Sequence, residues 1–171
     1  MISKKLHKAI NAQINRELFS EYLYLSMSAW FAKENLDGFA SWMHVQAQEE
    51  HFHAMKFFNY LLERGAGVVL EQIDKPTTEF GNPLKAFQMA YEHEQYITKN
   101  INDLMDLANK ENDHAAKSFL EWYVNEQVEE EASADKIVSR LKMIGDRIEG
   151  IFMLDNTLGQ RTYTEPSSTE E

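Results

Sequence analysis

The stretch AKSFLEWYVNEQVEEEASADKIVSRL, residues 116–141, decides the fold class of this chain. Its apolar residues recur in alternating steps of four and three, the spacing of a helix that buries one face in a bundle. The predicted buried stripe is Ala116, Leu120, Tyr123, Gln127, Glu130, Ala134, Ile137 and Leu141. Gln127 and Glu130 therefore occupy positions where a bundle core normally holds apolar side chains.

The same helical period occurs in three more long segments, and the glycines gather in the breaks between helices, at Gly38, at Gly65 and Gly67, at Gly81 and from Gly145 onward. Long helices are predicted at about residues 4–33, 39–64, 83–110 and from residue 113 or 114 to 143, followed by a short helix at about residues 146–158. Asn82 as N-cap and Pro83 at the first helical position mark one clear helix start. The chain is therefore predicted to be all-α.

The segment of residues 65–82 (GAGVVLEQIDKPTTEFGN) has no helical period and sets the topology. A loop of about 18 residues reaches roughly 60 Å when extended, whereas a helix of about 27 residues is only about 40 Å long. The segment can therefore run the whole bundle length, so that the third helix returns parallel to the second. Two antiparallel hairpins joined by one long crossover form the ferritin-like four-helix bundle. We expect one domain over residues 1–160 and a disordered tail over residues 161–171.

Charge and composition narrow the possible functions. The chain of 171 residues has 28 acidic and 17 basic residues, a net charge of −11, and no cysteine. An acidic surface repels nucleic acid and anionic lipid, and without cysteine the chain cannot form zinc ribbons or iron–sulfur clusters. The N-terminal lysines precede no apolar run, and no segment approaches the roughly 20 apolar residues of a membrane span. We expect a soluble cytoplasmic protein that binds metal ions through oxygen and nitrogen, with no nucleic-acid or membrane partner.

Each of the four long helices places an acidic residue inside its apolar stripe. The inward residues are Glu17 in the first helix, Glu50 and His53 in the second, Glu94 in the third, and Gln127 and Glu130 in the fourth. Because they lie at similar heights along their helices, they should meet at one level of the bundle. Burying an unpaired carboxylate costs several kcal/mol, whereas total stability is about 5 to 15 kcal/mol. No lysine or arginine is expected in this layer, so protons, water or bound cations must compensate the charge.

Two metal ions compensate these acids most simply. Carboxylate oxygens with one imidazole and no sulfur suit iron or manganese, and zinc is able to compete. Glu50 and His53 form a Glu-x-x-His element on one helix face, as in carboxylate-bridged di-iron bundles. Taken singly, several charged residues nearby also fit a solvated helix face: Glu49, His51, Glu126, Glu129 and Glu131. Tyr24 and Trp122 taken alone fit ordinary packing, but the joint occurrence of acids in four helices favours a metal site.

The chain resembles the bacterial non-haem ferritins over residues 1 to about 160. The resemblance rests on REL at residues 16–18, EEHFHAMK at residues 49–56 and NEQVEEE at residues 125–131, with matching spacings and crossover. It implies a homo-oligomeric shell of 24 subunits that serves iron homeostasis. Each subunit is then a ferroxidase, which oxidises Fe(II) at a di-iron centre with dioxygen or hydrogen peroxide and stores a ferric mineral inside the shell.

The resemblance also implies ligands for three iron positions. They are Glu17, Glu50 and His53 for the first iron; Glu50, Glu94 and Glu130, with Gln127 close by, for the second; and Glu49, Glu126 and Glu129, with Glu130 shared, for the third. Tyr24 matches a tyrosine beside the centre, and Trp122 is a nearby aromatic residue. Either can supply an electron when dioxygen is reduced.

Departures from related families narrow the resemblance. Bacterioferritin carries a second Glu-x-x-His element in the fourth helix and a haem-ligating methionine just after the bridging glutamate. The matching positions here are Gln127 to Glu130 and His51, so no haem is expected. Rubrerythrin adds a four-cysteine iron domain, which this chain cannot form, and the starvation-type mini-ferritins place their iron site between subunits.

Two other functions stay open at this point. A di-iron oxygenase would need an apolar pocket beside the metals for an organic substrate. A purely structural or cation-buffering shell would bind iron without oxidising it. The oxidant, the iron entry channels, the nucleation residues and the iron-release partner do not follow from the sequence.

Overall fold

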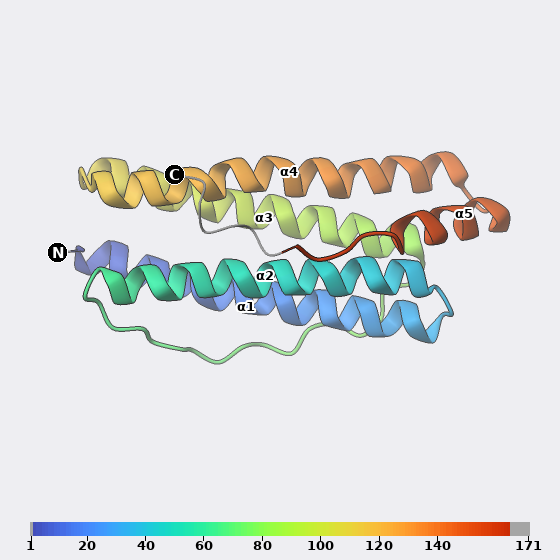
Figure 1. The fold of residues 1–171 in the computed structure, drawn as a ribbon, viewed down its shortest axis with the longest axis horizontal. Helices are drawn as coiled ribbons and strands as arrows, with labels where there is room; N and C mark the ends of the chain where they lie inside the picture. The colour runs from blue at the N-terminus through green and yellow to red at the C-terminus, as the bar shows by residue number, and fades with distance from the viewer. Residues whose placement is uncertain (1, 165–171) are drawn as a thin grey trace.

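Five helices make up the structure, a computed structural model that describes residues 2–164 (Figure 1). The helices are α1 Lys4–Lys33, α2 Asp37–Glu63, α3 Pro83–Lys110, α4 His114–Ile144 and α5 Ile148–Leu158. The predicted all-α bundle with one long crossover and a short fifth helix is confirmed. Two helix starts differ slightly from the prediction: α2 begins earlier, at Asp37, and α5 begins later, at Ile148.

The crossover between α2 and α3 runs along the outside of the α1–α2 hairpin (Figure 1). Side chains of α1 fix its backbone: Asn11 accepts from the Val69 N–H at 2.7 Å, and Asn15 donates to the Gln72 carbonyl at 3.1 Å. These bonds satisfy backbone groups that have no helical partner. The crossover therefore spans the bundle in an extended form, and α3 returns parallel to α2.

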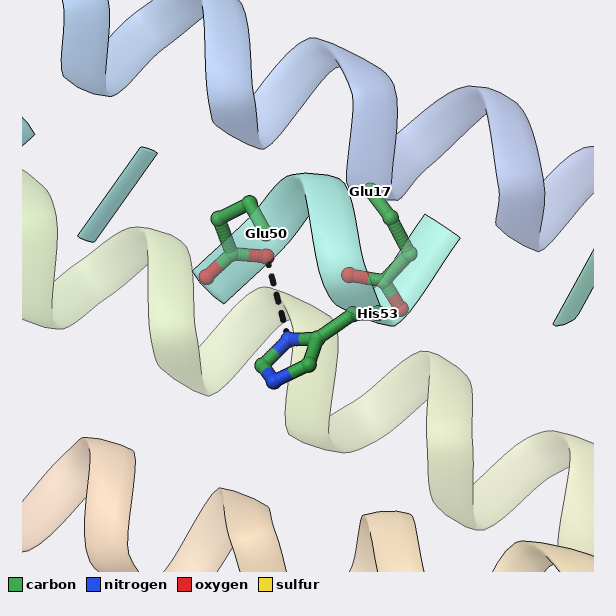
Figure 2. Close-up of side chains that lie close together, drawn as sticks. All are labelled: Glu17, Glu50 and His53. Carbon is green, nitrogen blue, oxygen red and sulfur yellow. Dashed lines mark ion pairs between the residues drawn. The ribbon is translucent and has the colours of Figure 1, made fainter. Parts of the chain in front are cut away.

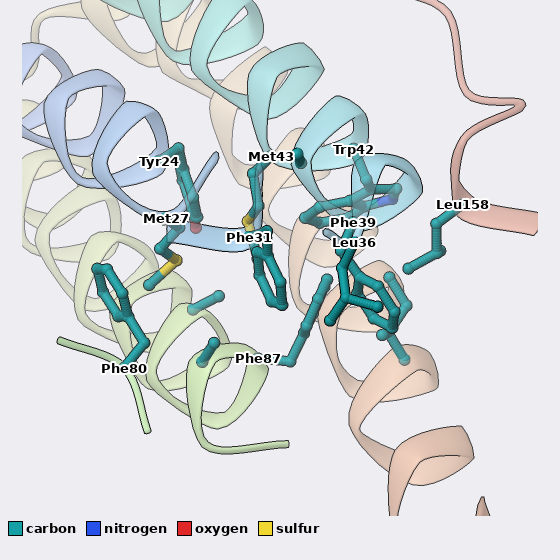
Figure 3. Close-up of a cluster of buried hydrophobic side chains, with 14 of the residues drawn as sticks. Tyr24, Met27, Phe31, Leu36, Phe39, Trp42, Met43, Phe80, Phe87 and Leu158 are labelled. Atoms are coloured by element: carbon teal, nitrogen blue, oxygen red, sulfur yellow. The ribbon is translucent and has the colours of Figure 1, made fainter. Parts of the chain in front are cut away.

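A polar layer divides the apolar core into two clusters. One cluster, around Phe31, Phe39 and Phe87, lies toward the α1–α2 turn (Figure 3). The other, around Phe57 and Tyr123, lies toward the opposite end of the bundle. The buried polar residues between them are Gln13, Glu17, Ser20, Gln46, Glu50, His53, Glu94, Gln127 and Glu130. Apolar burial on both sides supplies the stabilisation that holds this layer inside the bundle.

Helix α5 packs against the start of α2 (Figure 1). The N-cap of α2, Leu36, has no side chain that can cap, and Asp155 of α5 supplies the cap by accepting from the Phe39 N–H at 2.9 Å. Gly38 permits this approach, because a Cβ atom there would lie 1.8 Å from the Asp155 carbonyl oxygen. The contact fixes where the segment after α5 begins.

The start of the predicted tail lies against α2. Its first residue, Arg161, is half-buried and donates hydrogen bonds to Gln46 and Glu49 of α2. The chain therefore stays in contact with α2 beyond residue 160, because Gln46, which is buried, and Glu49, which is half-buried, accept from the guanidinium. Residues 165–171 of that tail lie outside the described residues. Within residues 2–164, every helix is too short or too polar to cross a membrane.

Candidate metal centre

The inward residues predicted from helix phase all lie in the polar layer. Their exposed fractions are 0% for Glu17, 1% for Glu50, 2% for His53, 1% for Glu94, 3% for Gln127 and 5% for Glu130. They come from four helices, which meet at one level of the bundle. Helix phase therefore located these residues inside the core correctly.

Glu17, Glu50 and His53 form the first group of potential ligands (Figure 2). Glu17 projects from α1, and the other two residues project from successive turns of α2. One ligand atom of each residue lies within 4.8 Å of those of the other two, close enough to share one metal ion. Nδ1 of His53 lies 3.5 Å from Oε2 of Glu50, and the Tyr123 hydroxyl donates to the His53 carbonyl at 2.7 Å. α4 thus helps to fix the position of His53.

A second group joins His53 to α4. Oxygen atoms of Glu126 and Glu130 lie within 4.8 Å of each other and of a ring nitrogen of His53. Nε2 of His53 is 3.9 Å from Oε1 of Glu126. The proximity of Glu126 and Glu130 agrees with the third position that the resemblance implies, whereas His53 was expected with Glu17 and Glu50 alone. His53 lies between the two groups and can belong to either.

Glu94 is held by hydrogen bonds from α1 and α4. The Tyr24 hydroxyl donates to Oε1 of Glu94, and the Gln127 amide donates to Oε2 at 3.5 Å. The Thr98 hydroxyl lies 3.0 Å from Oε1 of Gln127 and 2.6 Å from Oε1 of Glu131, and its single proton can be donated to either oxygen. Tyr24 therefore contacts a predicted ligand directly.

Three carboxylate oxygens of the predicted first ligand group have no hydrogen-bond partner. They are Oε2 of Glu17 and both oxygens of Glu50. A buried acceptor without a partner is costly, and most such groups in proteins are satisfied. Carboxylate oxygen together with imidazole nitrogen is a donor set that suits iron, manganese or zinc. The residues present therefore fit metal ions.

Burial controls the protonation of these carboxyl groups. Burial, aided by the negative charge of Glu50, raises the pKa of Glu17 from 4.5 to about 8. Burial and neighbouring carboxylates also raise the pKa of Glu50, Glu94 and Glu130. Since ligands must be deprotonated, a metal ion that binds here displaces protons, and its affinity increases with pH.

The residues predicted for a third iron position lie at the edge of the layer. Glu126 is half-buried and close to His53, whereas Glu129 is exposed and lies outside both ligand groups. Glu49 is half-buried, and Arg161 forms an ion pair with it. This edge is more open and less completely assembled than the interior.

Besides Thr98 and Tyr123, three further residues that contact the predicted ligands were not predicted as parts of the site. Gln13 donates to Oε1 of Glu17 at 2.8 Å, and Gln46 donates to Oε2 of Glu130 at 2.5 Å. Each glutamine stands four residues before a predicted inward acid, Gln13 before Glu17 and Gln46 before Glu50, and that one-turn spacing was the available signal. Arg161 gave no such signal, because its position depends on how α5 packs.

The fold and the buried acid layer together define a ferritin-like protein. The family model of the ferritin-like domain matches residues 7–144. A bacterial non-heme ferritin from Bacteroides fragilis is 47% identical over 161 residues, which cover 94% of this chain and 100% of the relative. That from Campylobacter jejuni is 41% identical over 155 residues, which cover 91% of this chain and 93% of the relative. The chain belongs to the bacterial non-haem ferritin family.

Solved structures support the same conclusion. An open pore ferritin from the hyperthermophilic archaeon Archaeoglobus fulgidus is similar with a TM-score of 0.94 and 48% identity, covering 95% of this chain and 100% of that chain. A humanized archaeal ferritin has a TM-score of 0.95 and 49% identity, covering 96% of this chain and 99% of that chain. Membership of this family supports iron storage as the broad function.

Proposed function

We propose that this protein is an iron-storage ferritin that oxidises Fe(II) to Fe(III) in its buried acid layer. The unpartnered oxygens of Glu17 and Glu50 carry the proposal, since a buried carboxylate oxygen without a hydrogen-bond partner requires a proton or a cation. The donor set alone also suits manganese or zinc. Family membership favours iron, which is here the substrate and the stored cargo.

Three iron positions are proposed, and no haem. The ligands are Glu17, Glu50 and His53 for the first; Glu50, Glu94 and Glu130, with Gln127 close by, for the second; and Glu49, Glu126 and Glu129, with Glu130 shared, for the third. The mutual proximity of Glu17, Glu50 and His53 supports the first position most directly. Tyr24 orients Glu94 through its hydroxyl and is placed to supply an electron.

The proposed reaction takes one electron from each of two Fe(II) ions. Dioxygen accepts two electrons and two protons to give hydrogen peroxide, or peroxide accepts two electrons and two protons to give two water molecules. The carboxylates neutralise the positive charge that iron gains, and His53 orients one ion. Glu17, whose pKa is about 8, releases its proton when iron binds. The buried layer thereby changes from neutral acids to ligands.

We extend the proposal to a cytoplasmic shell of 24 subunits that holds the ferric mineral. Exposed apolar side chains support assembly: Tyr22 on α1, Val69 and Leu70 on the crossover, and Phe152 and Met153 on α5. Assembly of subunits would remove these apolar side chains from water. Light scattering would measure the mass of the assembly, and a stable monomer would contradict the shell.

Stopped-flow absorbance after mixing with Fe(II) and dioxygen tests the oxidation. Wild type should show a fast transient from the oxidised iron pair, and Glu17→Ala and Glu94→Ala should lose it. Glu121→Ala removes an exposed acid of α4 and should oxidise iron at the wild-type rate. Folded ligand variants that oxidise Fe(II) as fast as wild type would contradict the proposal. A wild type without the fast transient would instead indicate a cation-buffering shell.

A further inference from the structure

The segment after α5 brings a cation to the edge of the acid layer. Arg161 donates from Nη1 to Oε1 of Gln46 at 2.8 Å and from Nη2 to Oε2 of Glu49. Its guanidinium carbon lies 4.5 Å from the centre of the Trp42 ring. Across residues 2–164, no other lysine or arginine forms an ion pair with a proposed iron ligand. Among the described residues, Arg161 is therefore the one lysine or arginine that pairs directly with a proposed iron ligand.

The fold fixes the position of this arginine. Asp155 of α5 caps the start of α2, and the Arg161 N–H donates to the Leu158 carbonyl at 3.1 Å, so the segment turns directly after α5. Gln46 and Glu49 lie about one turn apart on α2, which lets one planar guanidinium bind both. The side chains of Arg161 and Glu49 are only 26% and 21% exposed, so salt screens this pair less than a fully exposed one.

Gln46 connects Arg161 to the buried ligands. Its Oε1 accepts from Arg161, and its Nε2 donates to Oε2 of Glu130 at 2.5 Å. The guanidinium thus contacts Glu49 directly and reaches Glu130, the shared ligand, through one amide. A metal ion that binds Glu49 must share its carboxylate with Arg161 or displace the guanidinium. Since both are positive, their repulsion opposes joint occupancy.

We propose that Arg161 is a built-in competitor for the third iron position. Its guanidinium neutralises Glu49 until a third ion binds, and it then moves outward toward solvent. Glu17 and Glu50 have unpartnered oxygens, and within residues 2–164 no lysine or arginine forms an ion pair with either, so metal ions fill the inner positions first. The third position is consequently the weakest of the three. This inference rests on the third position of the proposed function.

Titration of the metal-free, assembled protein with Zn(II) tests the competition without redox chemistry. Isothermal titration calorimetry counts the ions bound per subunit and measures their affinities. Arg161→Gln should tighten the weakest ion by about 3- to 10-fold, as expected for loss of a partly shielded ion pair. The two tighter ions should keep their affinities. Arg161→Lys keeps the charge but loses the planar fork, so its affinity for the weakest ion should lie between those of wild type and Arg161→Gln.

Two further variants complete the experiment. Arg140→Gln removes the same charge from α4 at about 15 Å along the helix from Glu130, and it should change no affinity. Glu49→Gln identifies the third ion, because it should weaken that ion alone. If Glu49→Gln weakens the third ion but neither Arg161 variant binds that ion more tightly than wild type, the proposal that Arg161 competes with it is wrong. The proposed iron positions are then unaffected. If no bound ion depends on Glu49, the third position is wrong, and the role of Arg161 is wrong with it.

Discussion

The interior of the acid layer and its outer edge balance their charges in different ways. In the interior, Glu17 and Glu50 are buried and have unpartnered oxygens, and burial raises the pKa of Glu17 to about 8. At the edge, Glu49 already binds Arg161, and Glu129 is exposed to solvent. Within residues 2–164 no lysine or arginine forms an ion pair with Glu17 or Glu50, so a proton or a metal ion must compensate their charge, whereas Glu49 has an arginine and Glu129 has water. The same side chain is therefore a strong or a weak ligand according to its other partners.

Alanine substitutions on the two sides should show the largest difference. Glu50→Ala removes a carboxylate that no neighbour replaces, so the initial rate of Fe(II) oxidation should fall by more than about 100-fold, beyond the 10- to 100-fold typical of supporting residues. Glu49→Ala should slow the same phase by less than about threefold, because its carboxylate is already paired at the edge. Stopped-flow absorbance measures both rates. If Glu50→Ala and Glu49→Ala reduced the initial oxidation rate equally, interior and edge acids would not differ in their importance for the reaction.

The packing of α5 should affect the edge and leave the interior intact. Gly38→Ala places a Cβ atom 1.8 Å from the Asp155 carbonyl oxygen, so α5 must shift and the cap on Phe39 is lost. We expect a loss of about 1 to 3 kcal/mol in the free energy of unfolding, as for other overpacked sites. Fe(II) oxidation at the interior positions should stay within about twofold of wild type, because distant sites behave independently.

Gly67→Ala is the matched control for this substitution. A Cβ atom at Gly67 meets no neighbouring atom within 4 Å, so the stability should not fall. Thermal unfolding of the three proteins measures the difference. A Gly38→Ala protein as stable as wild type would show that α5 does not depend on this contact.

The same division explains what the sequence could and could not predict. Glu17, Glu50, Glu94 and Glu130 were found because helix phase alone decides whether a residue faces the core of a bundle. The crossover was found because the segment of residues 65–82 has no helical period and is long enough to span the bundle. Arg161 was missed, since its place depends on the packing of α5 against α2, and a pattern of period 3.6 carries no information about such a contact between distant segments.

The interior acids should make the stability of the metal-free protein decrease with pH. Below its ordinary pKa of 4.5, Glu17 is protonated in both the folded and the unfolded chain. Between 4.5 and about 8 the unfolded chain releases this proton while the folded chain keeps it, so the free energy of unfolding falls as pH rises. The slope for one such carboxyl is at most about 1.4 kcal/mol per pH unit. Above that range the loss is complete and constant.

Glu17→Gln isolates this contribution, because the amide mimics the protonated acid and does not titrate. The pH range from 5 to 8 lies between the ordinary pKa of Glu17, 4.5, and its raised pKa of about 8. Over this range, the thermal unfolding midpoint of the metal-free variant should fall less than that of metal-free wild type. Glu121→Gln, at an exposed position, should follow the wild-type curve. Parallel curves for wild type and Glu17→Gln would mean that Glu17 is ionised in the folded, metal-free protein.

The smallest effect is expected within the edge itself. Glu129 is exposed and lies outside both ligand groups, so Glu129→Gln should weaken the third Zn(II) ion by only about two- to threefold, the range of a solvated charge interaction. Glu126 is half-buried beside His53 and Glu130, and Glu126→Gln should weaken the same ion by about tenfold or more, since shielding from water strengthens the interaction. Calorimetry compares the two variants directly. A larger effect at Glu129 than at Glu126 would mean that the third ion binds outside the half-buried edge, where water rather than the bundle sets its affinity.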